Sequence, residues 1–405
     1  RSGGEIFRDA SGRNIGKMDD PERYIYNQVR EVDYCSGACL YIRREVLDRV
    51  GYLDERFHPA YWEDTDLCFA AAAAGFKVLY EPAAVVIHLE GGTAGRGAEQ
   101  SSRSRALQEA NKPKFVAKWA SALATRRANM YDHRRPGGKP QLLLILPFMP
   151  MYDKAAGELR WFRTLPILQE RYDVVLLARN AQQQTQYINA VEAMGITVHA
   201  TDQARLEKMG IRAEAPFRLD FEALLRANDF RAVIVGFWHV AHQYVTEIRR
   251  WAPDAYVIID SFDVEFLRRS RKAELLDSDA ERWEAERVRR LELGMYRRAD
   301  RVLTVCEQDR QVLLAEAPDL SIGISADIHP QLPRAEGEPH DLLFVGNFGH
   351  EPNEDAVCWF CDEVWPRIRP RLPGVKCLIV GTPPPRRCRL QARRAHGVGA
   401  FPHVH

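Results

Sequence analysis

The sequence contains no apolar run long enough to cross a bilayer, and its opposite charges nearly cancel. The longest apolar stretches, such as 142–150, fall well short of the roughly 20 residues that a membrane-spanning helix needs. Lys and Arg number 57 against 56 Asp and Glu, which gives a formal net charge of +1. These properties exclude a spanning helix and argue against a protein that binds polyanions through its overall charge.

Cysteine spacings typical of a disulfide framework are also missing. The eight cysteines are scattered through apolar runs that resemble strands and helices. Cys358 and Cys361 have redox or zinc-type spacing, but they lie inside the helical pattern EDAVCWFCDEVWPRI, without a second pair or a His pair at ligand distance. We therefore expect ordinary buried thiols in a reducing cytoplasm.

With 405 residues the chain is too long for one ordinary core, so two or three domains are expected. Residues 1–131 form a mixed unit of strands and helices. A polar linker with Gly and Pro, DHRRPGGKP, follows at 132–140. We expect separate cores on its two sides, few contacts across it, and lower stability for the first of the two.

From residue 141 onward, strands alternate with helices. The apolar runs include LLLILPF, DVVLLAR, ITVHA, AVIVGF, YVIIDSF and RVLTVC, and one long charged helix is expected from about 265 to 298. Such alternation predicts an α/β fold with a parallel sheet over 141–335. A new strand, DLLFVGNF, opens a last unit at 336–405, which we expect to be incomplete because nucleotide-binding sheets have five or six strands.

The densest group of acidic residues stands where a helix is expected to begin. Glu63 and Asp64 precede the Ala-rich run DLCFAAAAAG, and a carboxylate is stabilised at a helix N-terminus. Asp64 and Asp66 have the spacing of a metal-binding DxD motif. Residues two apart on a helix point about 200° apart, so these two carboxylates do not chelate one ion together. One of them should face the site while the other supports the fold.

This segment resembles the acceptor half of family 2 glycosyltransferases, which have the GT-A fold. The family pattern G-G-[FY]-D-E-x-F, E-D-x-D-L, G, P and H is matched over about the first 120 residues. Leu53 departs from it at a packing position. The residues aligned with the pattern, including this departure, are Gly51, Tyr52, Leu53, Asp54, Glu55, Phe57, Glu63, Asp64, Asp66, Leu67, Gly75, Pro82 and His88.

The resemblance implies an inverting sugar transfer in which Asp64 is the general base. It places Trp62, Glu63 and Asp66 on the acceptor side, with Trp62 stacking on the acceptor sugar. His88 matches a metal ligand, although a strand-ending His is often only a hydrogen-bonded surface residue. The half that holds Mg²⁺ or Mn²⁺ on the donor diphosphate should precede residue 1, and because Arg1 is not an initiator Met, the chain resembles a fragment. By itself it should not transfer sugar.

Residues from about 139 onward resemble GT-B glycosyltransferases, closest to family 4. The turn LLLILPFMPMYDKAAGELRWF offers Gly157 as a donor-binding glycine or as a simple helix-start residue. The match is stronger in DLLFVGNFGHEPNEDAVCWFCDEVWPRIRPRLPGVKCLIVG, although the family's phosphate-binding Arg/Lys pair is not evident there. Its candidate donor-binding residues are Gly346, Asn347, His350 and Asn353, of which Asn353 could instead cap the helix.

Three acidic residues follow the buried strand YVIIDSF, at the strand end where α/β sites are built. Asp260, Asp263 and Glu265 are candidate acceptor-side groups or solvated capping carboxylates. The Arg-rich segment 281–298 interleaves Glu with Arg, which favours a solvated face over a membrane or nucleic-acid surface.

The combined expectation is a two-module glycosyltransferase of bacterial surface polysaccharide synthesis, with a nucleotide-sugar donor and a glycan or lipid-linked acceptor. It would be cytoplasmic, with peripheral contact to the inner membrane face as an option, and would bind no nucleic acid. The alternative is an inactive fragment or a non-catalytic sugar- or partner-binding scaffold. A dehydrogenase is disfavoured because no G-x-G-x-x-G follows either opening strand.

Overall fold

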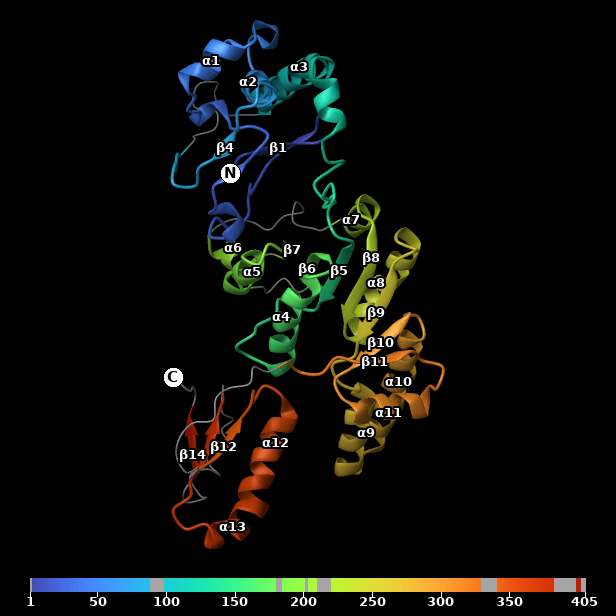
Figure 1. Ribbon diagram of the computed structural model, residues 1–405. Coiled ribbons are helices and arrows are strands. Elements are labelled where there is room, and N and C mark those ends of the chain that lie inside the picture. Colours follow the sequence, from blue (N-terminus) through green and yellow to red (C-terminus); the bar gives the residue numbers. More distant parts are fainter. Residues whose placement is uncertain are drawn as a thin grey trace. The chain divides into compact units, whose positions relative to one another are not determined.

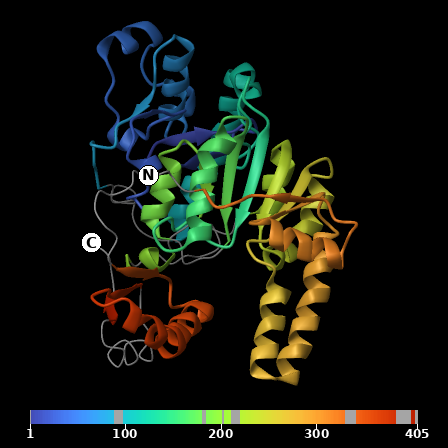
Figure 2. The same cartoon turned by 60° about the horizontal axis from the view of Figure 1, so that its bottom comes forward.

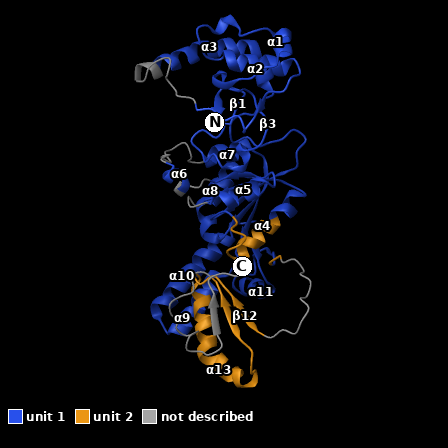
Figure 3. Cartoon of the chain, turned by 90° about the vertical axis from the view of Figure 1, so that its left-hand side faces the viewer, with its two compact units in different colours: residues 1–149, 165–326 blue, residues 150–164, 327–405 orange. Residues whose placement is uncertain are grey.

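The computed structural model describes residues 2–87, 98–179, 184–200, 203–209, 220–328, 341–381 and 398–401. Contacts divide the chain into two compact units (Figure 3). The first comprises Arg1–Met149 and Leu165–Ala326, and the second comprises Pro150–Thr164 and Asp327–His405. Each unit is described by itself below.

The N-terminal part of the first unit has short strands and a small apolar core. Strands β1 (Gly4–Ile6) and β2 (Gly12–Asn14) pair antiparallel, as do β3 (Arg30–Glu31) and β4 (Leu79–Tyr80). The helices are α1 (Arg44–Val50), α2 (Glu63–Ala73) and α3 (Ala98–Ala124), with 3-10 turns at Tyr24–Tyr26, Gly37–Cys39 and Glu55–Phe57 (Figure 1). The core residues are Ile6, Ala10, Phe57, Phe69, Phe115 and Leu123.

A seven-stranded sheet follows, in which every described strand pair is parallel. The strand order is β11-β10-β9-β8-β5-β6-β7. All six residues of β5 are buried, as expected for an apolar strand in a parallel sheet. The strands are β5 (Gln141–Leu146), β6 (Asp173–Ala178), β7 (Thr197–His199), β8 (Phe230–Gly236), β9 (Tyr256–Asp260), β10 (Arg301–Thr304) and β11 (Ile322–Ile324).

The order of these strands reverses between β5 and β8. The chain runs from β5 through β6 to β7 on one side, and then from β8 through β9 and β10 to β11 on the other. In parallel α/β sheets, ligands bind beyond the carboxyl ends of the strands at such a switch point. The expected α/β fold with a parallel sheet is therefore confirmed, and the sheet has one edge where a site is favoured.

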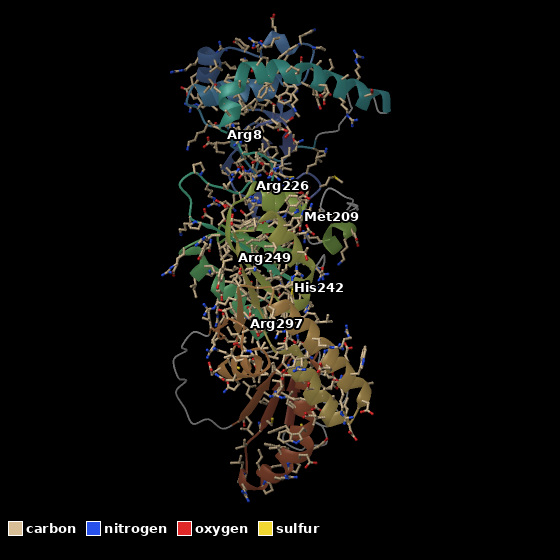
Figure 4. All side chains as sticks on the ribbon, turned by 90° about the vertical axis from the view of Figure 1, so that its right-hand side faces the viewer. Arg8, Met209, Arg226, His242, Arg249 and Arg297 are labelled. Carbon is tan, nitrogen blue, oxygen red and sulfur yellow. The ribbon has the colours of Figure 1, made fainter. Side chains whose placement is uncertain are left out.

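Helices join the strands of the sheet. α8 shows the amphipathic pattern, because its buried residues include Val240 and Val245 while His242 and Arg249 lie on another face (Figure 4). The helices are α4 (Ala156–Gln169), α5 (Thr185–Glu192), α6 (Gln203–Lys208), α7 (Phe221–Ala227), α8 (Trp238–Trp251), α9 (Glu265–Leu276), α10 (Asp279–Tyr296) and α11 (Glu307–Glu316). Within the described residues, no helix is both long and apolar enough to span a membrane.

The prediction of a single long helix from about 265 to 298 is wrong. The segment forms two helices, α9 and α10, which lie side by side as an antiparallel hairpin (Figure 2). Asp277 adopts the left-handed conformation with φ +45°, and the side chain of Ser278 accepts a hydrogen bond from the Glu281 amide and so caps α10. Asp277 therefore ends α9, and Ser278 begins α10. A Ser before a helix is a start signal that is visible in the sequence.

The second unit contains a three-stranded parallel sheet of order β12-β13-β14. Its strands are β12 (Leu342–Val345), β13 (Cys377–Val380) and β14 (Val398–Phe401); its helices are α12 (Glu351–Trp359) and α13 (Trp365–Ile368), joined by a π-helical turn at Phe360–Val364 and followed by a 3-10 turn at Arg369–Arg371. The core between sheet and helices includes Cys358, Cys361, Trp365 and Cys377.

The expectation of buried thiols is confirmed for Cys68, Cys358, Cys361 and Cys377. It is wrong for Cys39, which is exposed, and Cys35 and Cys306 are partly exposed. Burial raises the pKa of the Cys361 thiol to about 11, so this sulfur stays protonated and unreactive at neutral pH. Cys388 lies outside the described residues.

The expectation that few contacts cross between the first segment and the parallel sheet is wrong. Their strands form separate sheets, but Arg23, which is 6% exposed, forms an ion pair with Glu192 of α5, which is 3% exposed. Thr185 also donates to Asp20 at 2.5 Å. Within the linker, Asp132 is buried while residues 134–140 are exposed. Polar partners far apart in sequence produced an interface that no local pattern indicated.

Candidate functional site

The acidic cluster lies at the start of α2, and a strained backbone leads into it. Tyr61 and Trp62 adopt positive φ angles of +74° and +80°, which L-residues with large side chains rarely adopt. Asp64 is partly exposed in the first turn of the helix. Its Oδ2 accepts a hydrogen bond from the Gly37 amide at 2.9 Å, and its Oδ1 accepts one from the Thr65 amide at 2.7 Å. These bonds fix a carboxylate that solvent still reaches.

Asp66 occupies a different environment, although it is only two residues away. It is 3% exposed, and its carboxylate accepts hydrogen bonds from Lys118 Nζ at 2.8 Å and from Trp119 Nε1 at 2.7 Å. The expectation that one carboxylate supports the fold is confirmed for Asp66. The assignment of Asp66 to acceptor binding is corrected, because both carboxylate oxygens are already engaged inside the protein.

Helix α3 holds the loop that carries these residues. Asn111 is buried and its Nδ2 donates to the carbonyl oxygens of Phe57, Ala60 and Tyr61 at 2.9–3.1 Å. Lys118 also forms an ion pair with Asp54 at 2.8 Å, which lowers the pKa of Asp54 to about 2. These supporting residues were missed by the sequence analysis, although Asn111, Phe115, Lys118 and Trp119 share the spacing of one helix face.

Trp62 and Glu63 lie beside Asp64 with distinct surroundings. The Trp62 ring packs on Phe115 with centroids 4.6 Å apart, and its Nε1 donates to the Gln108 carbonyl at 3.0 Å. That packing and that bond hold the ring in place while leaving it partly exposed. Burial raises the pKa of Glu63, with a further contribution from nearby Asp64, and its Oε2 is buried without a hydrogen-bond partner in the described part of the chain.

The metal-ligand prediction falls on His88, which lies outside the described residues. Among the residues that are described, no group of three or more His, Cys, Asp or Glu side chains could hold an ion. Asp64 and Asp66 bond to different partners, as the rejection of a DxD motif expected.

The three acidic candidates lie at the carboxyl end of β9, where Asp260 is the last residue of the strand, but their side chains have different surroundings. Asp260 is fully buried, which corrects its assignment to acceptor binding. Asp263 is about half exposed and pairs with Arg268 at 3.0 Å. Glu265 accepts from Trp238 Nε1 and from Arg269, both at 2.8 Å; although burial acts to raise its pKa, these bonds lower it.

In the second unit, the four candidates after β12 form one turn. The Asn347 carbonyl accepts from the His350 amide at 3.1 Å and from Asn353 Nδ2 at 2.9 Å, and Asn347 Oδ1 accepts from the Gly349 amide. Asn353 therefore does not cap α12; it lies within the first turn and ties the loop down. Gly346 leaves room for this packing, since a Cβ there would lie 3.3 Å from Asn353 Nδ2.

Gly157 lies at the second position of α4, which is the place expected of a simple helix-start residue.

The neighbouring residue, Glu158, was missed by the sequence analysis. Burial raises the pKa of Glu158 to about 7, and its Oε2 accepts from the Met151 amide at 3.1 Å. A carboxyl poised near neutrality beside a strand–helix turn is the kind of group found at functional sites. Its one sequence signal is its position next to Gly157.

The first unit thus presents a partly exposed carboxylate that is anchored by backbone amides at a helix start. Two segments of the chain match known protein families. Residues 19–106 match the family "Glycosyltransferase like family 2", and residues 339–405 match the family "Glycosyl transferases group 1". The chain therefore carries segments of two glycosyltransferase families, one toward each end.

Curated relatives match short parts of the chain. The protein y4gI of Sinorhizobium fredii is 31% identical over 109 residues, which are 27% of this chain and 11% of that protein. The N-acetylglucosaminyl-diphospho-decaprenol L-rhamnosyltransferase of Mycobacterium tuberculosis is 40% identical over 67 residues, which are 16% of this chain and 22% of that enzyme. The chain thus matches about a tenth of the length of the first relative and about a fifth of the second.

Solved structures superpose on a larger part of this chain. The superposition with sucrose-phosphate synthase from Thermosynechococcus elongatus includes 65% of this chain and 71% of that enzyme's chain, with 12% identity and a TM-score of 0.40. A lipopolysaccharide outer core galactosyltransferase covers 65% and 68%, with 11% identity and a TM-score of 0.37. At these scores the superpositions by themselves assign no fold family.

Proposed function

We propose that this chain is part of an enzyme that transfers a sugar from a nucleotide-sugar donor to a glycan or lipid-linked acceptor in bacterial surface polysaccharide synthesis. The observation that carries the proposal is Asp64. Its carboxylate is held by the Gly37 amide, remains partly exposed, and lies inside the segment that matches family 2. The rhamnosyltransferase named above supports the pathway.

In the proposed reaction the acceptor hydroxyl attacks the anomeric carbon of the donor sugar. The bond from that carbon to the diphosphate oxygen breaks with inversion, and Asp64 takes the hydroxyl proton as the new bond forms. A carboxylate suits this role because the hydroxyl becomes acidic only during attack. The strained backbone at Tyr61 and Trp62 supports a site here, since such strain persists where function requires the geometry.

The remaining assignments belong to the same proposal. The first segment would be the acceptor half of a GT-A enzyme, with a Mg²⁺ or Mn²⁺ ion on the donor diphosphate. The parallel sheet and the last unit would be the two domains of a GT-B enzyme, with the turn around Asn347 on the donor side. The protein would act in the cytoplasm, at or near the inner face of the membrane.

Asp64→Asn tests the proposal in the protein as the cell makes it. The amide keeps the shape, and its single oxygen can still accept the Gly37 hydrogen bond, although the bond from the Thr65 amide is lost. It cannot take up the hydroxyl proton. We expect turnover to fall by roughly a hundredfold to ten-thousandfold, with donor binding nearly intact. The measurement is the rate of sugar transfer together with the affinity for the nucleotide sugar.

Asp48→Asn is the matched control. Asp48 lies on α1, exposed and paired with Arg44, and the same change there should leave turnover within about twofold. Equal turnover for Asp64→Asn and the unaltered protein would remove Asp64 from the mechanism. Sugar binding without transfer to any acceptor would instead favour the non-catalytic scaffold.

A further inference from the structure

Helix α10 carries an exposed tryptophan and an exposed glycine on one face. It belongs to the α9–α10 hairpin, which projects from the parallel sheet (Figure 2). Trp283 is 65% exposed, and a Cβ at Gly294 would meet no other atom within 4 Å in the described part of the chain. At about 100° per residue, their separation in the helix brings the two side-chain directions to within about 20° of each other. Trp283 and Gly294 therefore lie in line along the helix.

This face is opposite the one that α10 buries. The buried residues include Ala285, Val288 and Glu292, whose directions lie roughly 140–200° from that of Trp283. A glycine inside a helix weakens it relative to alanine, and the open space at Gly294 gives no packing reason for it within the chain. Tryptophan is enriched at the centres of protein interfaces. A large exposed ring in line with an exposed glycine suits a second helix that packs on this face.

The two halves of α10 and its C-terminal end carry opposite net charge. Segment 279–286 has four acidic residues and one arginine, whereas segment 287–298 has five arginines and one acidic residue, Glu292, which is buried. A second copy of α10 that runs antiparallel sets each acidic half against a basic half, and such complementarity favours specific association. A parallel copy would set like charges together. An anionic membrane would attract one half and repel the other, so charge favours a second copy of this chain.

We propose that α10 is a dimerisation surface on which two copies of the chain pack antiparallel, with Trp283 of each copy over Gly294 of the other. A two-fold axis perpendicular to the helix produces both contacts at once, and two-fold symmetry is the commonest in homo-oligomers. Glycine lets the indole approach the backbone of the other copy, as a knob enters a hole between packed helices. One helix face is at the small end for specific interfaces, so we expect micromolar affinity. The inference is independent of the proposed sugar transfer.

The same register brings one pair of opposite charges together across the dimer. It sets Asp279 opposite position 298 of the other copy, one residue from Arg297, and helical geometry places both side chains on the same side of the seam. Inside one chain, Asp279 and Arg297 lie about 27 Å apart along the helix, so they cannot meet there. Their partners within the chain, Arg282 and Asp319, form exposed ion pairs with them, which contribute little.

Sedimentation velocity of the full chain between about 1 and 200 µM measures the dimer. We expect a concentration-dependent dimer in the unaltered chain, and dimerisation at least about tenfold weaker in Trp283→Ala and in Gly294→Gln. Glutamine is a better helix former than glycine and has open space at this position, so Gly294→Gln, as a monomer at the lowest concentration, should melt at the same temperature or higher. A weaker dimer from a chain that is at least as stable is not a result of misfolding.

Trp359→Ala is the matched control, because Trp359 is 60% exposed on α12 and the change removes the same ring from another helix. It should dimerise as the unaltered chain does. A chain that stays monomeric throughout the concentration range, or that dimerises undiminished in both Trp283→Ala and Gly294→Gln, would overturn the proposal. A monomeric chain that binds vesicles of anionic phospholipid through Trp283 would also overturn it and would assign the face to a membrane.

A charge exchange tests the antiparallel register. Asp279→Arg and Arg297→Asp should each weaken the dimer by roughly threefold to tenfold at low salt, because each sets like charges together across the seam. The double variant restores opposite charges between the copies and should recover most of the lost affinity. Since the two positions cannot meet within one chain, recovery reports on contact between copies. Affinity in the double variant that is no better than in the single variants would overturn the antiparallel packing.

Discussion

At the scale of single residues, burial separates two aspartates that the sequence places side by side. Asp64 remains partly exposed with backbone donors, whereas Asp66 is buried against Lys118 and Trp119. Helical geometry predicted that the two would diverge. Which of them is buried depends on α3, because this helix supplies the partners of Asp66. One partner, Lys118, lies more than fifty positions from Asp66 in the sequence.

Lys118→Met tests the supporting role of this lysine. The change leaves the buried carboxylate of Asp66 without its cation, and a buried charged group deprived of a partner costs roughly 2 kcal/mol. We expect the free energy of unfolding to fall by about that amount in urea titrations. Lys112→Met, the same change on another face of α3, should cost less than about 0.5 kcal/mol. Equal losses would show that the Asp66 contact is not responsible.

At the scale of elements, α9 begins under a cap supplied by α10. Glu292 is fully buried; its carboxylate accepts hydrogen bonds from the amides of Glu265 and Phe266 and from the Tyr296 hydroxyl, at 2.8–3.2 Å. Burial raises the pKa of Glu292 to about 7. The residues at the start of α9 provide no side-chain cap, so a side chain of α10 accepts the bonds of its first amides instead. Capping rules based on neighbouring residues do not predict such a cap.

Glu292→Ala should therefore loosen the whole hairpin. Two amides, of which that of Phe266 is buried, and one hydroxyl lose their acceptor. We expect a loss of roughly 2–3 kcal/mol in the free energy of unfolding. Hydrogen exchange should speed up at the Glu265 and Phe266 amides in particular. Glu286→Ala, on the exposed face of the same helix, should change stability by less than about 0.5 kcal/mol. Unchanged exchange at both amides would contradict the capping role.

At the scale of the whole first unit, a buried ion pair joins the N-terminal segment to helix α5. Arg23 contacts both Asp19 and Glu192, and removing one partner of a buried pair leaves an uncompensated charge. We expect Arg23→Met to cost about 3 kcal/mol, and Arg23→Met with Glu192→Met to cost less than the sum of the single changes. Arg44→Met, at an exposed pair, is the control. Additive losses would mean that the two residues are not coupled.

A histidine pair at the same junction predicts a pH dependence. His133 and His199 approach with Nε2 atoms 2.9 Å apart, and burial lowers the pKa of His133 to about 3 and of His199 to about 4, from an ordinary 6.5. The folded chain keeps both neutral, while the unfolded chain takes up protons below pH 6.5. Stability should therefore fall as pH drops from about 6.5 toward 4, by at most about 1.4 kcal/mol per pH unit for each histidine.

The measurement is the melting temperature between pH 7 and pH 4.5, which lies inside that window. Replacing both histidines with asparagine removes the two titrating groups, so the variant should lose less stability than the unaltered chain over the same range. Identical pH profiles would show that the pair does not report on folding.

Local pattern in the sequence determined the parallel strands, the cap that divides α9 from α10, and the acidic motif at the start of α2. Each of these depends on residues within a few positions, where apolar periodicity and capping chemistry act directly. Tertiary structure alone decided that Asp66 and Asp260 are buried, that Phe237 stacks on Phe262, and that Arg23 meets Glu192. These contacts join residues up to 169 positions apart. Burial and pairing at such separations arise from packing between elements, which no local spacing encodes.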